Sequence, residues 1–301
     1  MTHVDNLRIH FDPNQRFLLN ILLGFLLFGV ALDIQKSDFE VLLKHPKAVL
    51  VGLLSQWFLV PTLTIALVYL FQPPTSVAMG MILVAACPGG NVSNYATHVA
   101  KGNTALAVTT TSVSTLASIL TMPMIFWAGA SLIPNLNNLQ QNIYINPLDI
   151  IQIVATLMLI PLTIGMFMNY HFPLFVSKIK KSVKIVSLLI FIGFIVGALI
   201  GNWENIKNYL KFVFVLTVIF NLLALILGYF VAKLTKLSEA DARAIAFETG
   251  IHNTTLGLIL VFQFFDGLGG MALIVAWYGI WDLITAYLLA HFWSKRGHTS
   301  G

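Results

Sequence analysis

One carboxylate, Glu248, lies well inside an apolar stretch that runs from Glu239 to Phe264 and is long enough to cross a lipid bilayer. A charge at that depth costs at least about 2.5 kcal/mol, so a carboxylate found there is a functional candidate by default. Glu248 could form an ion pair, stay protonated and hydrogen-bonded, or coordinate a cation. Because no lysine or arginine lies within residues 247–255, the ion pair is disfavoured and we favour the cation.

Oxygen-bearing side chains that could share a cation with Glu248 lie in other apolar stretches. Hard cations prefer several oxygen ligands. Residues 248–251 offer backbone carbonyls if their helix is unwound, and hydroxyl and amide oxygens are present at Ser93, Asn94, Thr111 and Thr115. The alternative role for the threonines at 109–111 is hydrogen bonding to their own preceding helical turn. The alternative role for Gln56 is to bridge two helices through its hydrogen bonds.

Two other titratable residues, Asp282 and His252, have two open interpretations each. Asp282 is either a hydrogen-bonded acid that packs helices or a functional one, and the residues alone do not separate these. His252, one turn from Glu248, is either a proton-coupling group, since its usual pKa is about 6.5, or a donor to a neighbouring carbonyl. The sequence has no phosphate loop, catalytic triad or metal-binding His and Cys pattern, which argues against an enzyme.

Two interruptions of helical sequence position these residues. The first, Cys87–Asn94, reads Cys-Pro-Gly-Gly-Asn-Val-Ser-Asn. Proline removes a backbone donor and paired glycines unwind the chain, so we expect one helix to end near Ala86 and the next to start near Asn91. Phe247–Thr255 is the second interruption. At mid-membrane depth such backbone is tolerated only where it lines a cavity or packs against protein.

Composition places the whole chain in a membrane. It has 301 residues, of which 57% are hydrophobic and 10% are charged, with a mean hydropathy of +0.84, whereas an ordinary soluble domain is about 25% charged. The one cysteine excludes an internal disulfide framework. The first apolar run has no convincing cleavage site after it, so we expect it to be retained.

Nine stretches are apolar enough to be transmembrane helices, given that a span needs roughly 20 residues. They are Phe17–Leu32, Ala48–Phe71, Val77–Ala100, Thr104–Leu132, Leu148–Met168, Val183–Ile200, Val213–Val231, Glu239–Phe264 and Met271–Trp293. We expect an all-α polytopic membrane protein in which residues 17–295 form the transmembrane domain. Residues 1–16 would be an extracytoplasmic segment and 296–301 a C-terminal tail.

The distribution of basic residues sets the orientation, because cytoplasmic loops are enriched in lysine and arginine. With the C-terminus inside, 13 of the 17 basic residues are cytoplasmic, and only Arg8, Arg16, Lys207 and Lys211 are outside. We therefore expect a multi-pass protein of the cell inner (plasma) membrane with its N-terminus outside. The net charge of +5 then reflects topology and requires no nucleic-acid partner. Residues 173–184, with four lysines, are either a cytoplasmic connector or an interfacial segment.

The two interrupted spans run in opposite directions across the membrane. Interrupted helices at corresponding positions of two oppositely oriented halves are typical of inverted-repeat secondary transporters. The half-helices that begin near Asn91 and Asn253 direct their positive ends toward the midplane, which favours an anionic substrate group. A channel would need a continuous polar pore, whereas the polar residues gather at one depth.

The chain resembles the bile acid:sodium symporter family over residues 24–296. The motifs that carry this resemblance are Phe28-Gly29-Val30-Ala31-Leu32, Lys36-Ser37-Asp38-Phe39, Lys44-His45-Pro46-Lys47, Cys87-Pro88-Gly89-Gly90 with Ser93-Asn94, Gly102-Asn103, Ser114-Thr115, and Glu248-Thr249-Gly250 with Asn253. The resemblance implies a ten-helix fold, here lacking the first helix, in which two discontinuous helices cross. A panel domain would comprise residues 17–47 and 148–200, and a core domain residues 48–132 and 213–295. Alternating access would come from their relative movement.

The resemblance also implies two sodium ions and an organic anion, which would be bile-acid-like, a steroid conjugate or a small carboxylate. The first sodium site would use Ser93, Asn94, Thr111 and Glu248, although the family's further hydroxyl is replaced by Ala107. The second would use Gln56, Glu248, the carbonyls of Thr249 and Ile251, and His252 in place of the usual glutamine. Asn91, Asn253 and Asp282 would contact the substrate. Because of His252, we expect weakened coupling at the second site or its partial replacement by protons.

Overall fold

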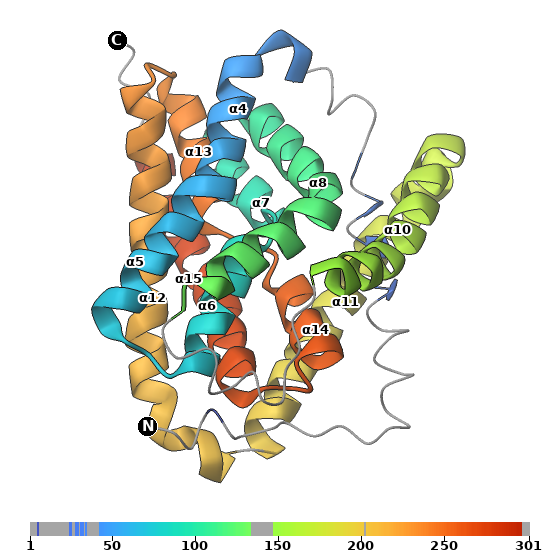
Figure 1. Cartoon of the computed structure of the whole chain (residues 1–301). Helices are drawn as coiled ribbons and strands as arrows, with labels where there is room; N and C mark the ends of the chain where they lie inside the picture. Colours follow the sequence, from blue (N-terminus) through green and yellow to red (C-terminus); the bar gives the residue numbers. More distant parts are fainter. Residues whose placement is uncertain are drawn as a thin grey trace.

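Helices make up all the regular structure that is described in the computed structural model of the protein (Figure 1). It describes residues 42–133, 147–201 and 203–296, with residues 5, 24, 25, 28, 29, 31, 32 and 34, and only some of the side chains between 147 and 208. The helices are α4 (Pro46–Leu54), the π-helix η1 (Ser55–Leu59), α5 (Val60–Phe71), α6 (Thr75–Ala86), α7 (Asn91–Val99), α8 (Thr104–Ser131), α10 (Pro147–His171), α11 (Pro173–Gly201), α12 (Trp203–Leu234), α13 (Glu239–Gly250), α14 (Thr254–Phe264) and α15 (Gly269–Lys295).

The described residues include four helical segments long and apolar enough to cross a membrane. These are Pro46–Phe71, Thr104–Ser131, Tyr209–Leu234 and Gly269–Lys295. Large apolar side chains such as Leu70, which is 73% exposed, and Phe230, which is 58% exposed, face outward. Contiguous exposed apolar surface is unfavourable in water and favourable in lipid. The protein is therefore a multi-pass membrane protein.

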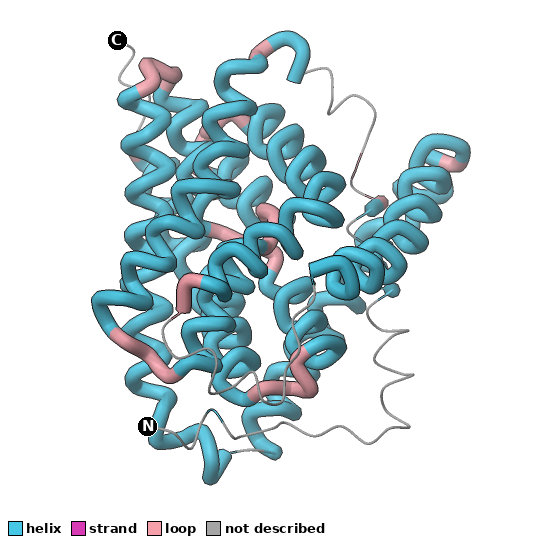
Figure 2. The backbone as a smooth tube through the Cα atoms, in the orientation of Figure 1, coloured by secondary structure: helices cyan, strands magenta, loops and turns pink. Residues whose placement is uncertain are grey.

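The predicted interruptions are confirmed at both places. α6 ends at Ala86 and α7 begins at Asn91, while α13 ends at Gly250 and α14 begins at Thr254. The loops that separate these half-helices lie inside the bundle (Figure 2). Residues 173–184, predicted as a cytoplasmic connector or an interfacial segment, are helical, since α11 starts at Pro173 and continues to Gly201. The first predicted span lies mostly outside the described residues, and the count of nine spans stays a prediction.

The broken helix α6–α7 occupies the centre of the bundle. Every residue of α6 from Ser76 to Ala86 is buried, and α6 packs between α8 and α15. Glycine permits this approach: a Cβ added at Gly80 would lie 2.8 Å from the Met271 Cα. α10 lies to one side (Figure 1) and packs against α8. The polar residues of the breaks are thus held by apolar helices on several sides.

Candidate functional site

The two breaks meet inside the bundle. The Asn253 backbone N–H donates to the Pro88 carbonyl at 2.8 Å, and Gly89 pairs with His252 in an isolated antiparallel bridge. A Cβ added at Gly90 would lie 3.3 Å from the His252 carbonyl oxygen. Backbone groups that lose their helical partners in a membrane must find others within the protein. Each break supplies such partners to the other.

Glu248 lies beside this contact and is 1% exposed. Its carboxylate accepts hydrogen bonds from the Ser93 hydroxyl and from the Thr111 hydroxyl, which is 2.9 Å from each carboxylate oxygen. The Thr111 hydroxyl is also 3.2 Å from the Asn94 Oδ1. The Gln56 Nε2 donates to the Glu248 carbonyl at 2.8 Å and to Oε2 at 3.3 Å. Five residues expected at the site from the sequence are therefore brought together.

The cluster around Glu248 contains more acceptor oxygens than hydroxyl protons. The Ser93 hydroxyl faces both the Gly90 carbonyl and Glu248 Oε1. The Thr111 hydroxyl faces both carboxylate oxygens and Asn94 Oδ1. Each hydroxyl carries one proton, and N–H groups serve two of these four acceptors, since the Ser93 N–H donates to the Gly90 carbonyl at 3.0 Å and the Gln56 Nε2 to Glu248 Oε2 at 3.3 Å. The buried cluster thus brings together carboxylate, hydroxyl, amide and carbonyl oxygens, which are the ligand types that a hard cation prefers.

Gly89 leaves the room that Glu248 occupies. A Cβ at this position would lie 2.5 Å from Glu248 Oε2 and 3.1 Å from the Gln56 amide nitrogen, closer than side chains normally approach. Gly90, the second glycine of this sequence, leaves room for the other break, since a Cβ there would lie 3.3 Å from the His252 carbonyl oxygen. These glycines therefore permit both the break and the close seating of the carboxylate.

A π-helical turn, which the sequence did not predict, places Gln56 beside Glu248. Within η1 the Val60 N–H donates to the Ser55 carbonyl, five residues earlier. Pro61 follows directly, and because it lacks an N–H and crowds the preceding turn, a widened turn there is favoured. Gln56 Oε1 is buried without a hydrogen-bond partner among the described residues, so it adds another acceptor beside Glu248.

Unlike the side chains of the Glu248 cluster, those of His252 and Thr249 make no hydrogen bond to a described residue. The His252 ring is buried, packs edge-on against Tyr278 with centroids 5.7 Å apart, and neither ring nitrogen has a hydrogen-bond partner in the described part of the chain. The Thr249 hydroxyl is likewise buried and unpartnered there. The second ligand set, completed by Ile251 and Gln56, stays a prediction.

Asp282 braces the second break. Its carboxylate accepts from the His252 backbone N–H at 3.1 Å and from the Asn221 Nδ2 at 2.9 Å. The same Asn221 amide donates to the Gly250 carbonyl at 2.9 Å, which also accepts from the Tyr278 hydroxyl at 3.1 Å. These side chains satisfy backbone groups freed where α13 ends, as membrane burial requires.

The starts of the two half-helices lie at the breaks, as expected from the sequence. Asn91 is the first residue of α7. Asn253 precedes α14, and its side-chain oxygen accepts from the Leu256 N–H at 3.2 Å, which caps the helix. Thr115, one turn beyond Thr111, has a buried hydroxyl without a partner among the described residues. Ala107 is fully buried on α8 and supplies no side-chain oxygen.

Known proteins with similar sequences are transporters. Residues 20–209 match the model of a family described as the Sodium Bile acid symporter family. An uncharacterized sodium-dependent transporter of Bacillus subtilis is 30% identical over 92% of this chain and 83% of its own length. A sodium-dependent organic anion transporter of Homo sapiens is 27% identical over 89% of this chain and 70% of its own. A probable sodium/metabolite cotransporter of Oryza sativa subsp. japonica chloroplasts is 27% identical over 86% of this chain, which spans 64% of that protein.

Proposed function

Because the chain belongs to the Sodium Bile acid symporter family and is therefore a transporter and not an enzyme, we propose that it imports an organic anion with sodium by alternating access. The observation that supports this proposal best is the gathering of buried side-chain oxygens from Ser93, Asn94 and Thr111 around the Glu248 carboxylate. A sodium ion there would neutralise the carboxylate and use the oxygens that lack a proton.

The first sodium ion would be held by side-chain oxygens of Ser93, Asn94, Thr111 and Glu248. A second would use Gln56 Oε1, Glu248, and the carbonyls of Thr249 and Ile251, with His252 beside it. The unpartnered Gln56 oxygen supports this second set. The positive ends of the half-helices at Asn91 and Asn253 would face an anionic substrate group.

The substrate class that the family resemblance implies is an amphipathic or small organic anion, such as a steroid conjugate or a carboxylate. Its path would lie between a core domain of residues 48–132 and 213–295 and a panel domain of residues 17–47 and 148–200. The charge bias supports a plasma-membrane protein with its N-terminus outside. Asp282, a further candidate for substrate contact, already accepts two hydrogen bonds, so a brace at the break is its better-supported role.

Thermal stability of the purified protein with and without sodium tests the proposal. Sodium at about 100 times its dissociation constant should stabilise the fold by about 2.7 kcal/mol, and an effective anion should add to this. An equal concentration of potassium controls for ionic strength. Glu248→Gln keeps the shape of the side chain and removes its charge, so it should lose the response to sodium. If the variant responds to sodium like the parent, the site is wrongly assigned.

Partial replacement of sodium by protons is the alternative that we attach to His252, because a histidine stands there in place of the family's usual glutamine. Its ring would have to bind a proton although both nitrogens are buried without described partners, and such burial disfavours the charged form. Uptake of an identified anion should then need less sodium as the pH falls. Sodium stoichiometry that is unchanged between about pH 5.5 and about pH 8 would exclude this alternative. The variant His252→Gln provides the matched control, because an amide oxygen does not titrate in this range.

A further inference from the structure

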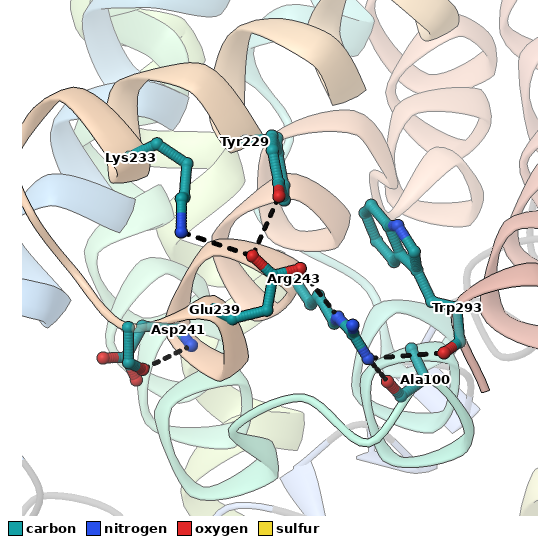
Figure 3. Close-up of polar contacts among 8 residues, drawn as sticks. Ala100, Tyr229, Lys233, Glu239, Asp241, Arg243 and Trp293 are labelled. Carbon is teal, nitrogen blue, oxygen red and sulfur yellow. Dashed lines mark hydrogen bonds and ion pairs between the residues drawn. The ribbon is translucent and has the colours of Figure 1, made fainter. Parts of the chain in front are cut away.

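A buried arginine fastens the ends of three helices at one end of the bundle. Arg243 on α13 is 4% exposed. Its Nη1 donates to the Ala100 carbonyl, directly after α7, at 2.8 Å and to the Trp293 carbonyl on α15 at 3.4 Å. The guanidinium carbon also lies 5.8 Å from the centroid of the Trp293 ring. Figure 3 shows how this one side chain reaches from α13 to both neighbours.

Glu239 keeps the buried guanidinium paired. Its Oε1 accepts from the Arg243 Nε at 3.1 Å. Its Oε2 accepts from the Tyr229 hydroxyl at 2.9 Å and from the Lys233 ammonium at 3.3 Å (Figure 3). We call Arg243, Glu239, and the carbonyls of Ala100 and Trp293 the Arg243 clamp. A buried charge that loses its partner is strongly destabilised, so the clamp depends on Glu239.

The clamp joins the two half-helices that carry the first ion site. α7 contributes Ser93 and Asn94, and α13 contributes Glu248. Arg243 precedes Glu248 by five residues, about 7.5 Å along the helix axis, and Ala100 follows Asn94 by six, about 9 Å. The clamp therefore lies within two helical turns of the site on both helices.

Other contacts also join these elements. At the breaks Asn253 bonds to Pro88, and after α7 the Asn103 N–H donates to the Ala240 carbonyl at 2.9 Å while its Nδ2 donates to Asp241 at 2.7 Å. α7 has only nine residues, and so short a helix is held in place by its packing and not by its own propensity. Without Arg243, the last turn of α7 would be tied to α13 through the loop at Asn103 and by apolar packing, which would let that turn shift. Such movement would displace Ser93 and Asn94 from Glu248.

We propose that Arg243 is a positioning residue: by bonding Ala100 and Trp293 it fixes α7 against α13, and so sets the separation of the Ser93 and Asn94 oxygens from the Glu248 carboxylate. This role rests on the proposed function only in naming sodium as the ion. The planar fork of arginine is required, because a lysine ammonium retains the charge and cannot reach Glu239 and both carbonyls with one fixed geometry.

Arg243→Lys and Arg243→Gln test the proposal against the matched control Lys233→Gln. Lys233 contacts the same Glu239 but is 43% exposed, where an ion pair contributes little. Two quantities are measured in each protein: the sodium concentration for half-maximal thermal stabilisation, and amide hydrogen exchange over residues 91–99. Both Arg243 variants should need about tenfold more sodium than the parent, as expected when support for metal ligands is lost. Relative to the parent, their amide exchange should increase over residues 91–99 and much less over α6. The control should match the parent in both.

The two measurements separate this inference from the proposed function. Unchanged amide exchange over residues 91–99 in both Arg243 variants overturns the clamp, whatever the sodium concentration for half-maximal stabilisation. Faster exchange with an unchanged sodium midpoint shows a merely structural role and also overturns the positioning role. A parent that does not respond to sodium refutes the proposed function, and the clamp is then decided by hydrogen exchange alone.

Discussion

Thr111 is placed so that its single hydroxyl proton cannot satisfy its three acceptor neighbours, the two oxygens of Glu248 and the Asn94 amide oxygen. Its neighbour Thr110 provides a contrast, because its hydroxyl bonds to the Leu106 carbonyl of its own helix at 2.9 Å. The two threonines are adjacent and both are buried. Only Thr111 has the geometry of an ion ligand.

Thr111→Val should therefore raise the sodium concentration needed for half-maximal stabilisation by about tenfold or more. Thr110→Val, which removes a hydroxyl of the same kind one position away, should leave that concentration unchanged, since it deletes only a bond within one helix. Titrations of thermal stability with sodium chloride measure both. Equal effects of the two substitutions would contradict the assignment.

Residue types predicted part of the Glu248 cluster. Glu248, Ser93 and Asn94 could be selected because polar side chains at the breaks lie at mid-membrane depth. Thr111 was chosen together with Thr115, which makes no hydrogen bond to a described residue, and the ion-binding role of Gln56 came from the family resemblance. Asn221 and Tyr278 were not selected, because each bonds the Gly250 carbonyl and a backbone acceptor has no signature in sequence. For Asn221 a signal existed: it is the one asparagine in the stretch 213–231.

Most helices that the structure describes followed the apolar runs, but α11 and α12 each begin about ten residues before the spans predicted from Val183 and Val213. The breaks could be placed from Pro88 with its two glycines and from the polar run after Glu248. The π-helical turn could not, because its widened turn follows from how Pro61 and the buried Gln56 fit the neighbouring helices. The start of α11 at Pro173 was not predicted, although proline is well suited to a first helical turn.

The first break also yields a prediction for its own conformation. Gly89→Ala should displace the Glu248 carboxylate, because the added Cβ would lie 2.5 Å from Oε2, and overpacking of this kind costs about 1–3 kcal/mol. Sodium affinity should fall together with stability. Gly193→Ala is the control, since a Cβ there meets nothing within 4 Å. Denaturation midpoints with and without sodium report both effects, and a Gly89 variant as stable as the parent would show that the carboxylate can be seated elsewhere.

At the scale of the molecule, the buried polar contacts are unevenly distributed among the helices. The breaks, the Glu248 cluster and the Arg243 clamp all lie among α4–α8 and α12–α15, whereas α10 meets them through α8. One described contact between α8 and α10 joins the Ser118 hydroxyl to the Met158 sulfur at 3.8 Å. α10 otherwise packs against α8 through apolar side chains, and its Met158 and Leu162 belong to the main apolar core. If a core moves relative to a panel, as the proposed alternating access requires, the α8–α10 contact is where we expect sliding, because apolar packing has no fixed hydrogen-bond geometry to break.

Linking α8 to α10 should therefore stop transport without removing the ion site. The chain has a single cysteine, Cys87, so Ser118→Cys and Met158→Cys can be combined with Cys87→Ala and oxidised to a disulfide, since both positions are buried and their side-chain atoms lie 3.8 Å apart. We expect the linked protein to keep its stabilisation by sodium, because the Glu248 cluster lies entirely on one side of the link, and to lose uptake of its anion. Reduction of the disulfide should restore uptake, and each single-cysteine variant treated with the same oxidant controls for other effects of oxidation. If the linked protein transports at the rate of the unlinked one, α8 and α10 move together, and the boundary between the moving domains must be drawn elsewhere.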